Sequence, residues 1–100
     1  MANSQINSMF KFVSEVIKTD TILVRLDQQS WVKSIAGMYY SVVSYSSTGK
    51  KIISLTLGDF GSLSSSVNVR PALIENNIHL LSSTNVFSSG AYQHIIIVYV

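Results

Sequence analysis

The two histidines, His79 and His94, are the first candidates for chemistry, because imidazole is a common metal ligand. A hairpin centred on the loop after Leu81 would place them opposite one another on neighbouring strands, with about 5 Å between their Cβ atoms. Two ligands do not make a metal site, and the chain contains no cysteine. Only a ring of such histidine pairs around the symmetry axis of an oligomer would supply enough ligands for a metal site. We interpret both as partly buried or interface histidines and expect neither a metal nor another cofactor.

The sequence gives no better support for acid-base or nucleophilic catalysis. The five acidic residues stand apart in separate loops or at element ends, where they suit caps and turns; they are Glu15, Asp20, Asp27, Asp59 and Glu75. Serine is abundant, but the sequence contains no G-x-S-x-G elbow. It also lacks both the G-x-x-x-x-G-K-[ST] and the G-x-G-x-x-G phosphate loops. We therefore predict that the chain is not an enzyme and has no catalytic residue.

A recognition role is indicated by two long polar loops, 58–66 and 82–90. Asp59 and Phe60 lie in the first loop, and Asn85 and Phe87 lie in the second. An aromatic face beside amide and carboxylate groups can stack on a ring that carries hydroxyls and form hydrogen bonds with it. These four residues are the predicted ligand-binding residues. The alternative is that Phe60 and Phe87 fold back as lids on the core.

The elements that must position these loops are mainly β. Runs rich in β-branched and aromatic residues recur about every ten residues, with turn signals between them. This spacing predicts an antiparallel β-sandwich or jelly-roll-like domain over residues 21–100. Pro71 cannot donate a ladder hydrogen bond, which places its strand at an edge or a bulge. The predicted strands are 21–26, 31–35, 39–45, 51–57, 67–73, 78–81 and the closing 91–100.

The last ten residues form the most strongly strand-forming stretch. At a period of two, Ile95 and Ile97 share one face, and Ile96, Val98 and Val100 share the other. Both faces are apolar. We therefore expect protein to cover both sides of this strand, either inside a sandwich or between a sheet and a partner chain.

If every connection reverses the chain, the two long loops share one end of the domain with 36–38. The short turns 27–30, 46–50 and 75–77 then lie at the other end. This arrangement would start the first strand, at Thr21, beside the proposed binding loops, so that an N-terminal stem and the binding loops would lie together. The stem and the binding loops are separated if residues 10–18 form an extra strand or a helix that runs back along the sandwich. Otherwise the short turns become the surface that lies farthest from the stem.

Residues 1–20 form a separate N-terminal segment, predicted as a short helix or a stem. Ile6, Met9, Val13 and Val16 follow a 3-4-3 spacing, and Ser4 is a suitable N-cap. A strand through residues 10–13 competes with the helix. The same spacing also fits two heptads of a coiled coil that joins identical chains.

The amino-acid composition limits the kinds of partner that the chain is expected to bind. Only 12% of the residues are charged and 47% are hydrophobic, which suits an oligomer that hides much of its exterior. The net charge of +2 is scattered, so no nucleic-acid partner is predicted. The start of the chain lacks the features of a signal peptide, and its longest apolar run is far short of the roughly 20 residues that span a bilayer. We expect no membrane insertion.

The order of elements resembles the C-terminal head domains of tailed-phage tail fibres and receptor-binding proteins. The resemblance covers residues 21–100 and rests on 30–32, 52–55, the loop with Asp59, 76–83 and the closing 95–100. It implies a homotrimeric virion protein, made in the host cytoplasm, that attaches to a host cell-surface glycan or protein. Receptor residues vary among such heads, so none is carried over by position. The chain starts without a shaft or anchoring region, which suggests an excised head or a small separate virion protein.

Two other functions remain open. A structural virion component, such as a capsid decoration or tail protein, would contact other virion proteins. A cellular carbohydrate-binding module would act as a monomer. The leading hypothesis is a non-enzymatic, trimeric phage adhesion head that binds a saccharide through its end loops.

Overall fold

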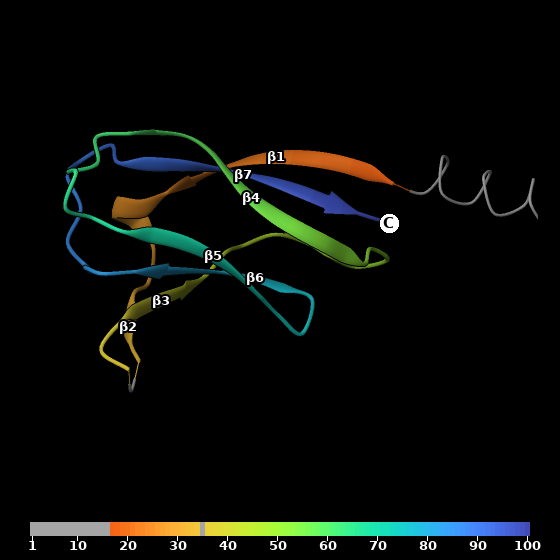
Figure 1. The fold of residues 1–100 in the computed structure, drawn as a ribbon, viewed down its shortest axis with the longest axis horizontal. Helices are drawn as coiled ribbons and strands as arrows, with labels where there is room; N and C mark the ends of the chain where they lie inside the picture. Colours follow the sequence, from red (N-terminus) through yellow and green to blue (C-terminus); the bar gives the residue numbers. More distant parts are fainter. Residues whose placement is uncertain (1–16, 35) are drawn as a thin grey trace, which may run out of the picture.

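A computed structural model describes residues 17–34 and 36–100 and arranges them in two antiparallel sheets that face each other (Figure 1). Sheet A has the strand order β1-β7-β4, and sheet B has the order β2-β3-β6-β5. The predicted mainly β, sandwich-like fold is therefore confirmed. The strands are β1 (Lys18–Arg25), β2 (Val32–Lys33), β3 (Tyr39–Val42), β4 (Ile52–Gly61), β5 (Val69–Ile74), β6 (Asn77–Ser82) and β7 (Tyr92–Tyr99).

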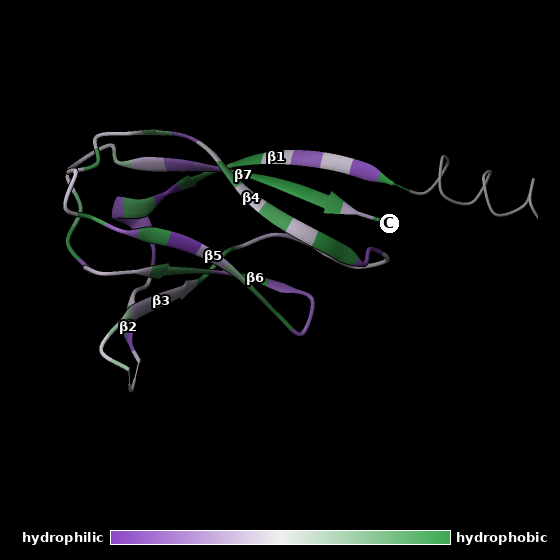
Figure 2. Cartoon of the chain, viewed as in Figure 1, coloured by the Kyte–Doolittle hydropathy of each residue, from purple (hydrophilic) through white to green (hydrophobic). Residues whose placement is uncertain are grey.

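The closing strand β7 lies at the centre of sheet A, paired with β1 on one side and β4 on the other. Ile95 and Ile97 point toward sheet B and are fully buried, because alternate side chains of a strand face opposite sides. Ile96 and Val98 point outward and are half-buried. Figure 2 shows the hydrophobic C-terminal half of β7 after a more polar start. The covering of its first face is confirmed, and the covering of its outer face stays a prediction.

Sheet B supplies the other half of the core. Ile78 and Leu80 of β6 point inward and are buried, and they pack with the isoleucines of β7 in one hydrophobic cluster. Pro71 lies on β5, which among the described strands pairs only with β6. The missing N–H of proline therefore faces no partner strand, as the sequence predicted.

The hairpin between β5 and β6 turns on Glu75 and Asn76, which both have positive φ, the geometry of a two-residue hairpin turn. Asn76 also joins the two sheets. Its Oδ1 accepts a hydrogen bond from the Ile52 amide at 2.9 Å, and its Nδ2 donates to the Lys50 carbonyl at 2.8 Å. One turn side chain thus fastens sheet B to the start of β4.

The connection after β1 corrects the predicted arrangement of the ends. The 3-10 turn η1 (Leu26–Gln28) is tied to the end of loop 83–91, since the Leu26 amide donates to the Ala91 carbonyl at 2.9 Å. The turn 27–30 therefore lies at the long-loop end, and its predicted place at the opposite end was wrong. The strand β1 and the loop share this end because Arg25 pairs with Tyr92.

The start of β1 lies at the other end, where Lys18 pairs with Tyr99 (Figure 1). The predicted conflict between an N-terminal stem and the binding loops therefore does not arise. That conflict followed from the assumption that every connection reverses the direction of the chain. In the structure, η1 instead carries the chain from sheet A to sheet B. Residues 1–16, on which most of the predicted N-terminal helix or stem falls, lie outside the described residues.

Candidate functional site

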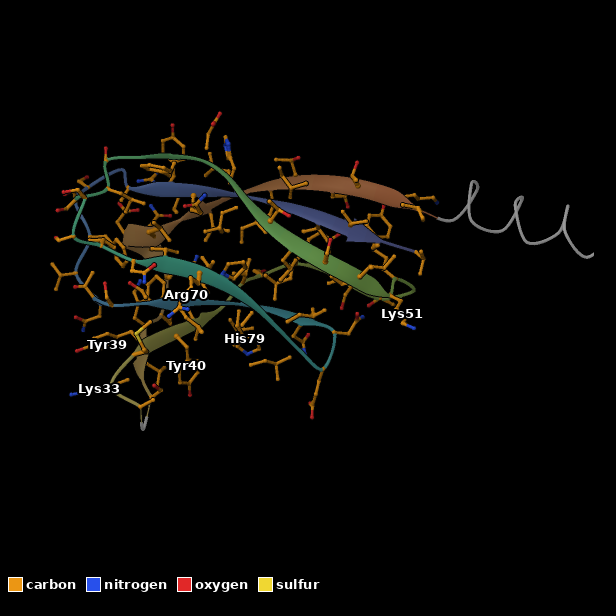
Figure 3. The ribbon with its side chains drawn as sticks, in the orientation of Figure 1. Lys33, Tyr39, Tyr40, Lys51, Arg70 and His79 are labelled. Carbon is orange, nitrogen blue, oxygen red and sulfur yellow. The ribbon has the colours of Figure 1, made fainter. Side chains whose placement is uncertain are left out.

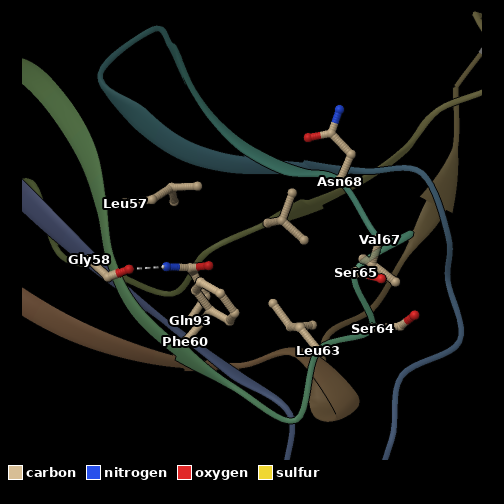
Figure 4. A pocket seen from close by; sticks show the side chains of 10 residues that line it. Leu57, Gly58, Phe60, Leu63, Ser64, Ser65, Val67, Asn68 and Gln93 are labelled. Carbon is tan, nitrogen blue, oxygen red and sulfur yellow. Dashed lines mark hydrogen bonds between the residues drawn. The ribbon is translucent and has the colours of Figure 1, made fainter.

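A cavity of about 560 Å³ opens between the two sheets at the long-loop end. This volume is in the usual range for small-molecule sites. Leucine, valine and phenylalanine side chains form most of its wall, and none of its lining residues is charged (Figure 4). The cavity therefore suits an uncharged ligand with an apolar part. Its lining residues are Leu57, Gly58, Phe60, Leu63, Ser64, Ser65, Val67, Asn68, Val69 and Gln93.

Gln93 is the polar group deepest in this cavity, with 2% of its surface exposed. Its Nε2 donates to the carbonyls of Gly58 at 3.0 Å, Asp59 at 3.2 Å and His94 at 3.0 Å. Three carbonyls around Nε2 fix the orientation of the amide, because only the NH₂ group can donate to them. The opposite atom, Oε1, accepts no hydrogen bond from the described residues and points toward the lining side chains (Figure 4). It is a fixed acceptor facing the cavity.

Phe60 stands at the mouth of the cavity with 62% of its surface exposed. An irregularity in the pairing of β4 with β7, between Leu57 and Phe60, brings Phe60 opposite Gln93. Bulges of this kind redirect side chains beside functional sites. The predicted loop over 58–66 is therefore shorter than expected: Asp59 and Phe60 belong to β4. Asp59 contributes its backbone carbonyl to the Gln93 amide, and its carboxylate does not line the cavity.

The rim of the cavity is made by loop 62–68. This loop is bound to loop 83–91, because Asn68 and Ser83 exchange two hydrogen bonds of 3.0 and 3.1 Å. Ser64 and Ser66 also bond to each other through their hydroxyls at 3.0 Å. The prediction that the two long loops meet at one end is confirmed.

The other two predicted ligand residues lie in loop 83–91. Phe87 stacks on Trp31 with ring centroids 5.2 Å apart and packs against the core. This position matches the alternative in which Phe87 is a lid on the core. Asn85 is exposed, and neither residue lines the cavity beside Phe60. The structure thus brings Phe60 and Gln93 together and leaves Asn85 and Phe87 apart from them.

The two histidines are not opposite each other, because β6 and β7 belong to different sheets. His79, which is labelled in Figure 3, lies between Val42 and Ala72 in sheet B, and His94 pairs with Leu23 in sheet A. The predicted hairpin was wrong, since loop 83–91 crosses from one sheet to the other. Among residues 17–34 and 36–100, no three histidine or acidic side chains gather where they could hold a metal ion.

Two ion pairs support the ends of the sandwich. At the long-loop end, Arg25 holds Asp27 with bonds of 3.1 and 3.0 Å, and the Gly90 amide donates to Asp27 at 3.0 Å. The Arg25 guanidinium, and then the Gly90 amide, lower the pKa of Asp27 below its ordinary value.

At the other end, Asp20 accepts a hydrogen bond from the Tyr45 hydroxyl at 2.7 Å and one from Lys50 at 3.3 Å. The Tyr45 phenol, and then the Lys50 ammonium, lower the pKa of Asp20. The Lys50 ammonium lies 4.8 Å from the Tyr45 ring centroid and 4.7 Å from that of Tyr99, within the range of a cation–π contact. Both acidic groups therefore act as structural anchors. Asp27 lies in the turn η1, as its interpretation as a turn residue implies, whereas Asp20 lies within β1, so its interpretation as a cap or turn residue was wrong.

Gln93 was missed by the sequence reasoning, although a signal was present. Extending the alternation of Ile97 and Ile95 back by one step reaches Gln93, which puts an amide on the buried face of the strand. A polar side chain at such a position must find partners or serve a ligand. The bulge in β4 also has a signal, because Gly58 lies within the irregular stretch and a glycine inside a strand often marks a bulge.

Comparison of the chain with protein-family models, with curated proteins and with solved structures found no match. Within the described part of the chain, no helix has the length and apolar character needed to cross a membrane. The fold and the cavity together define a β-sandwich with one uncharged, largely apolar hollow at its loop end.

Proposed function

We propose that the protein is a non-enzymatic receptor-binding head of a phage tail fibre that binds a host cell-surface saccharide. The observation that carries the proposal is the position of the cavity. Phe60 and Gln93 lie at the long-loop end, and the chain enters β1 at the opposite end. A head held at its N-terminal side would present this cavity outward, as attachment to a cell surface requires.

The lining of the cavity supports a saccharide as the ligand. An exposed aromatic ring such as Phe60 can stack on the C–H face of a sugar. Serine hydroxyls, the Asn68 side chain and Gln93 Oε1 can form hydrogen bonds with ring substituents. A few polar groups on a mainly apolar wall are typical of small-ligand sites.

The proposal includes a homotrimer located in the virion and contacts with other virion proteins. Its support is the outer face of sheet A. Val98 lies between Thr19 and Ser54, and Ile96 lies between Thr21 and Thr56. These two rows carry no charge, which suits burial against protein. The same face favours the second candidate, a structural virion component.

A glycan array probed with the purified chain tests the proposal. We expect retention on a limited set of saccharides and loss of that retention in Phe60→Ala. Val86→Ala is the matched control, because Val86 is 76% exposed on the other long loop and does not line the cavity. A chain that binds no saccharide on the array but associates with capsids or tails would contradict the proposal and support the structural role.

A further inference from the structure

Gln93 Oε1 accepts no hydrogen bond from the described residues, and it faces a cavity with an apolar wall. No buried side-chain nitrogen or oxygen of the described residues lacks a partner, so Oε1 is open to the cavity, where a donor from water or from a ligand can reach it. The three carbonyls that bind Nε2 prevent the amide from turning to offer its NH₂ group instead. A ligand that covers Oε1 and excludes water from it must therefore supply an N–H or O–H in its place.

The surroundings of Oε1 specify more of the ligand. Leu57, Leu63, Val67 and Val69 line the same cavity, and Leu57, Leu63 and Val67 pack against the hydrophobic core. A bare hydroxyl beside these side chains would leave apolar surface uncovered, whereas a methyl group would fill it. The absence of any charged lining residue disfavours acidic sugars, whose carboxylate would lose hydration without a cation to replace it.

From this arrangement we infer that the cavity binds a neutral 2-acetamido sugar. The inference rests on the proposed saccharide function and names its ligand class. The acetamido N–H donates to Gln93 Oε1, and the acetamido methyl contacts the leucine and valine wall. The pyranose ring lies against Phe60 at the mouth, where loop 62–68 supplies Ser64, Ser65 and Asn68 to its hydroxyls.

The test is an NMR titration of the isotope-labelled full chain with the methyl glycosides of N-acetylglucosamine, N-acetylgalactosamine, glucose and galactose. At least one N-acetylated sugar should shift the Gln93 side-chain resonances and bind at least about tenfold tighter than its parent, as one methyl in an apolar pocket can provide. Equal binding of the parent sugars would overturn the inference and leave the saccharide function intact. If none of the four binds and array-positive glycans lack an acetamido group, the inference fails alone. If the array is also empty, both proposals fail.

Two variants separate ligand contact from folding. Gln93→Met removes the acceptor but also three internal hydrogen bonds, so it can impair folding. Val67→Phe leaves Gln93 in place and fills the space assigned to the methyl group. We expect it to lower affinity for the N-acetylated sugar about tenfold. Its matched control, Val86→Phe, lies on the other loop and should bind as the unmodified chain does. Unchanged N-acetyl preference in Val67→Phe would overturn the assignment of the methyl.

Discussion

Asn68 and Ser83 join the two long loops through a reciprocal pair of hydrogen bonds. The Asn68 amide donates to Ser83 Oγ at 3.0 Å, and the Ser83 amide donates to the Asn68 carbonyl at 3.1 Å. Asn68 also lines the cavity. The shape of the cavity rim therefore depends on a residue of the neighbouring loop.

Ser83→Ala removes the acceptor for the Asn68 amide while keeping the second bond. We expect a loss of about 1 kcal/mol in the free energy of unfolding, the usual contribution of one hydrogen bond. Hydrogen exchange at the Asn68 amide should become faster, with weaker saccharide binding. Ser89→Ala, at an exposed serine of the same loop, is the control. Unchanged exchange at Asn68 would contradict the proposed role of Ser83.

Asp27 should make stability depend on pH. Its folded pKa lies below the ordinary value of 3.8, chiefly because Arg25 donates to its carboxylate. The stabilisation is therefore fully present above pH 3.8 and is lost as the pH falls through the folded pKa. We expect Asp27→Asn to unfold more easily than the unmodified chain at pH 7, with a gap that narrows below pH 3.8. Denaturant unfolding across this range measures the gap, and a constant gap would contradict the argument.

Strands and turns could be predicted because their signals are local. The turn at Asn76, which has positive φ, the edge position of Pro71 and the alternation of Ile95 and Ile97 each follow from residue type and period. The positive φ of Glu75 does not follow from its residue type. The assignment of strands to sheets could not be predicted. Nothing within 83–91 signals that this loop crosses between sheets, so the two histidines were wrongly paired.

The candidate site was predicted only in part for the same reason. Phe60 was chosen for its residue type, and the structure gives it a place at the cavity mouth. Its partner Gln93 comes from β7, more than thirty residues later, and the two meet only through the irregular register of β4. Gly58 signals that β4 can be irregular, but the register that brings Phe60 opposite Gln93 depends on how two strands fit together. Asn85 and Phe87 were equally suitable by residue type, but other contacts determine where they lie.

Gly61 has no room for a side chain beside Tyr92. A Cβ atom at this position would lie 2.7 Å from Tyr92 Cζ, so the ring must move. We expect Gly61→Ala to lower the free energy of unfolding by about 1–3 kcal/mol, as overpacking does. Tyr92→Ala provides the partner for a double-mutant cycle, since Gly61→Ala should cost much less in its presence. Additive losses in the double variant would show that Tyr92 is not the obstacle.

Substitution of Ile97 tests whether the two sheets pack against each other through their inner faces. Its side chain is fully buried between the sheets, so Ile97→Ala should cost about 2–5 kcal/mol through lost burial and a residual cavity. Val42→Ala changes a side chain that is 59% exposed on sheet B and should stay within about 0.5 kcal/mol. Chemical denaturation of both variants measures the difference. Equal losses would contradict the inward direction of Ile97.

The proposed trimer contact lies on the outer face of sheet A, and it can be tested by substitution there. A trimer of the 11.0 kDa chain has a mass of about 33 kDa, which light scattering at micromolar concentration distinguishes from a monomer. Val98→Lys places a charge in the uncharged row between Thr19 and Ser54, and burial of an unpaired charge is strongly unfavourable. We expect this variant to be monomeric. Val42→Lys, at a position 59% exposed on sheet B, is the matched control and should leave the mass unchanged. An unmodified chain that is already monomeric would exclude the trimer, and a trimer that survives Val98→Lys would place the contact on another face.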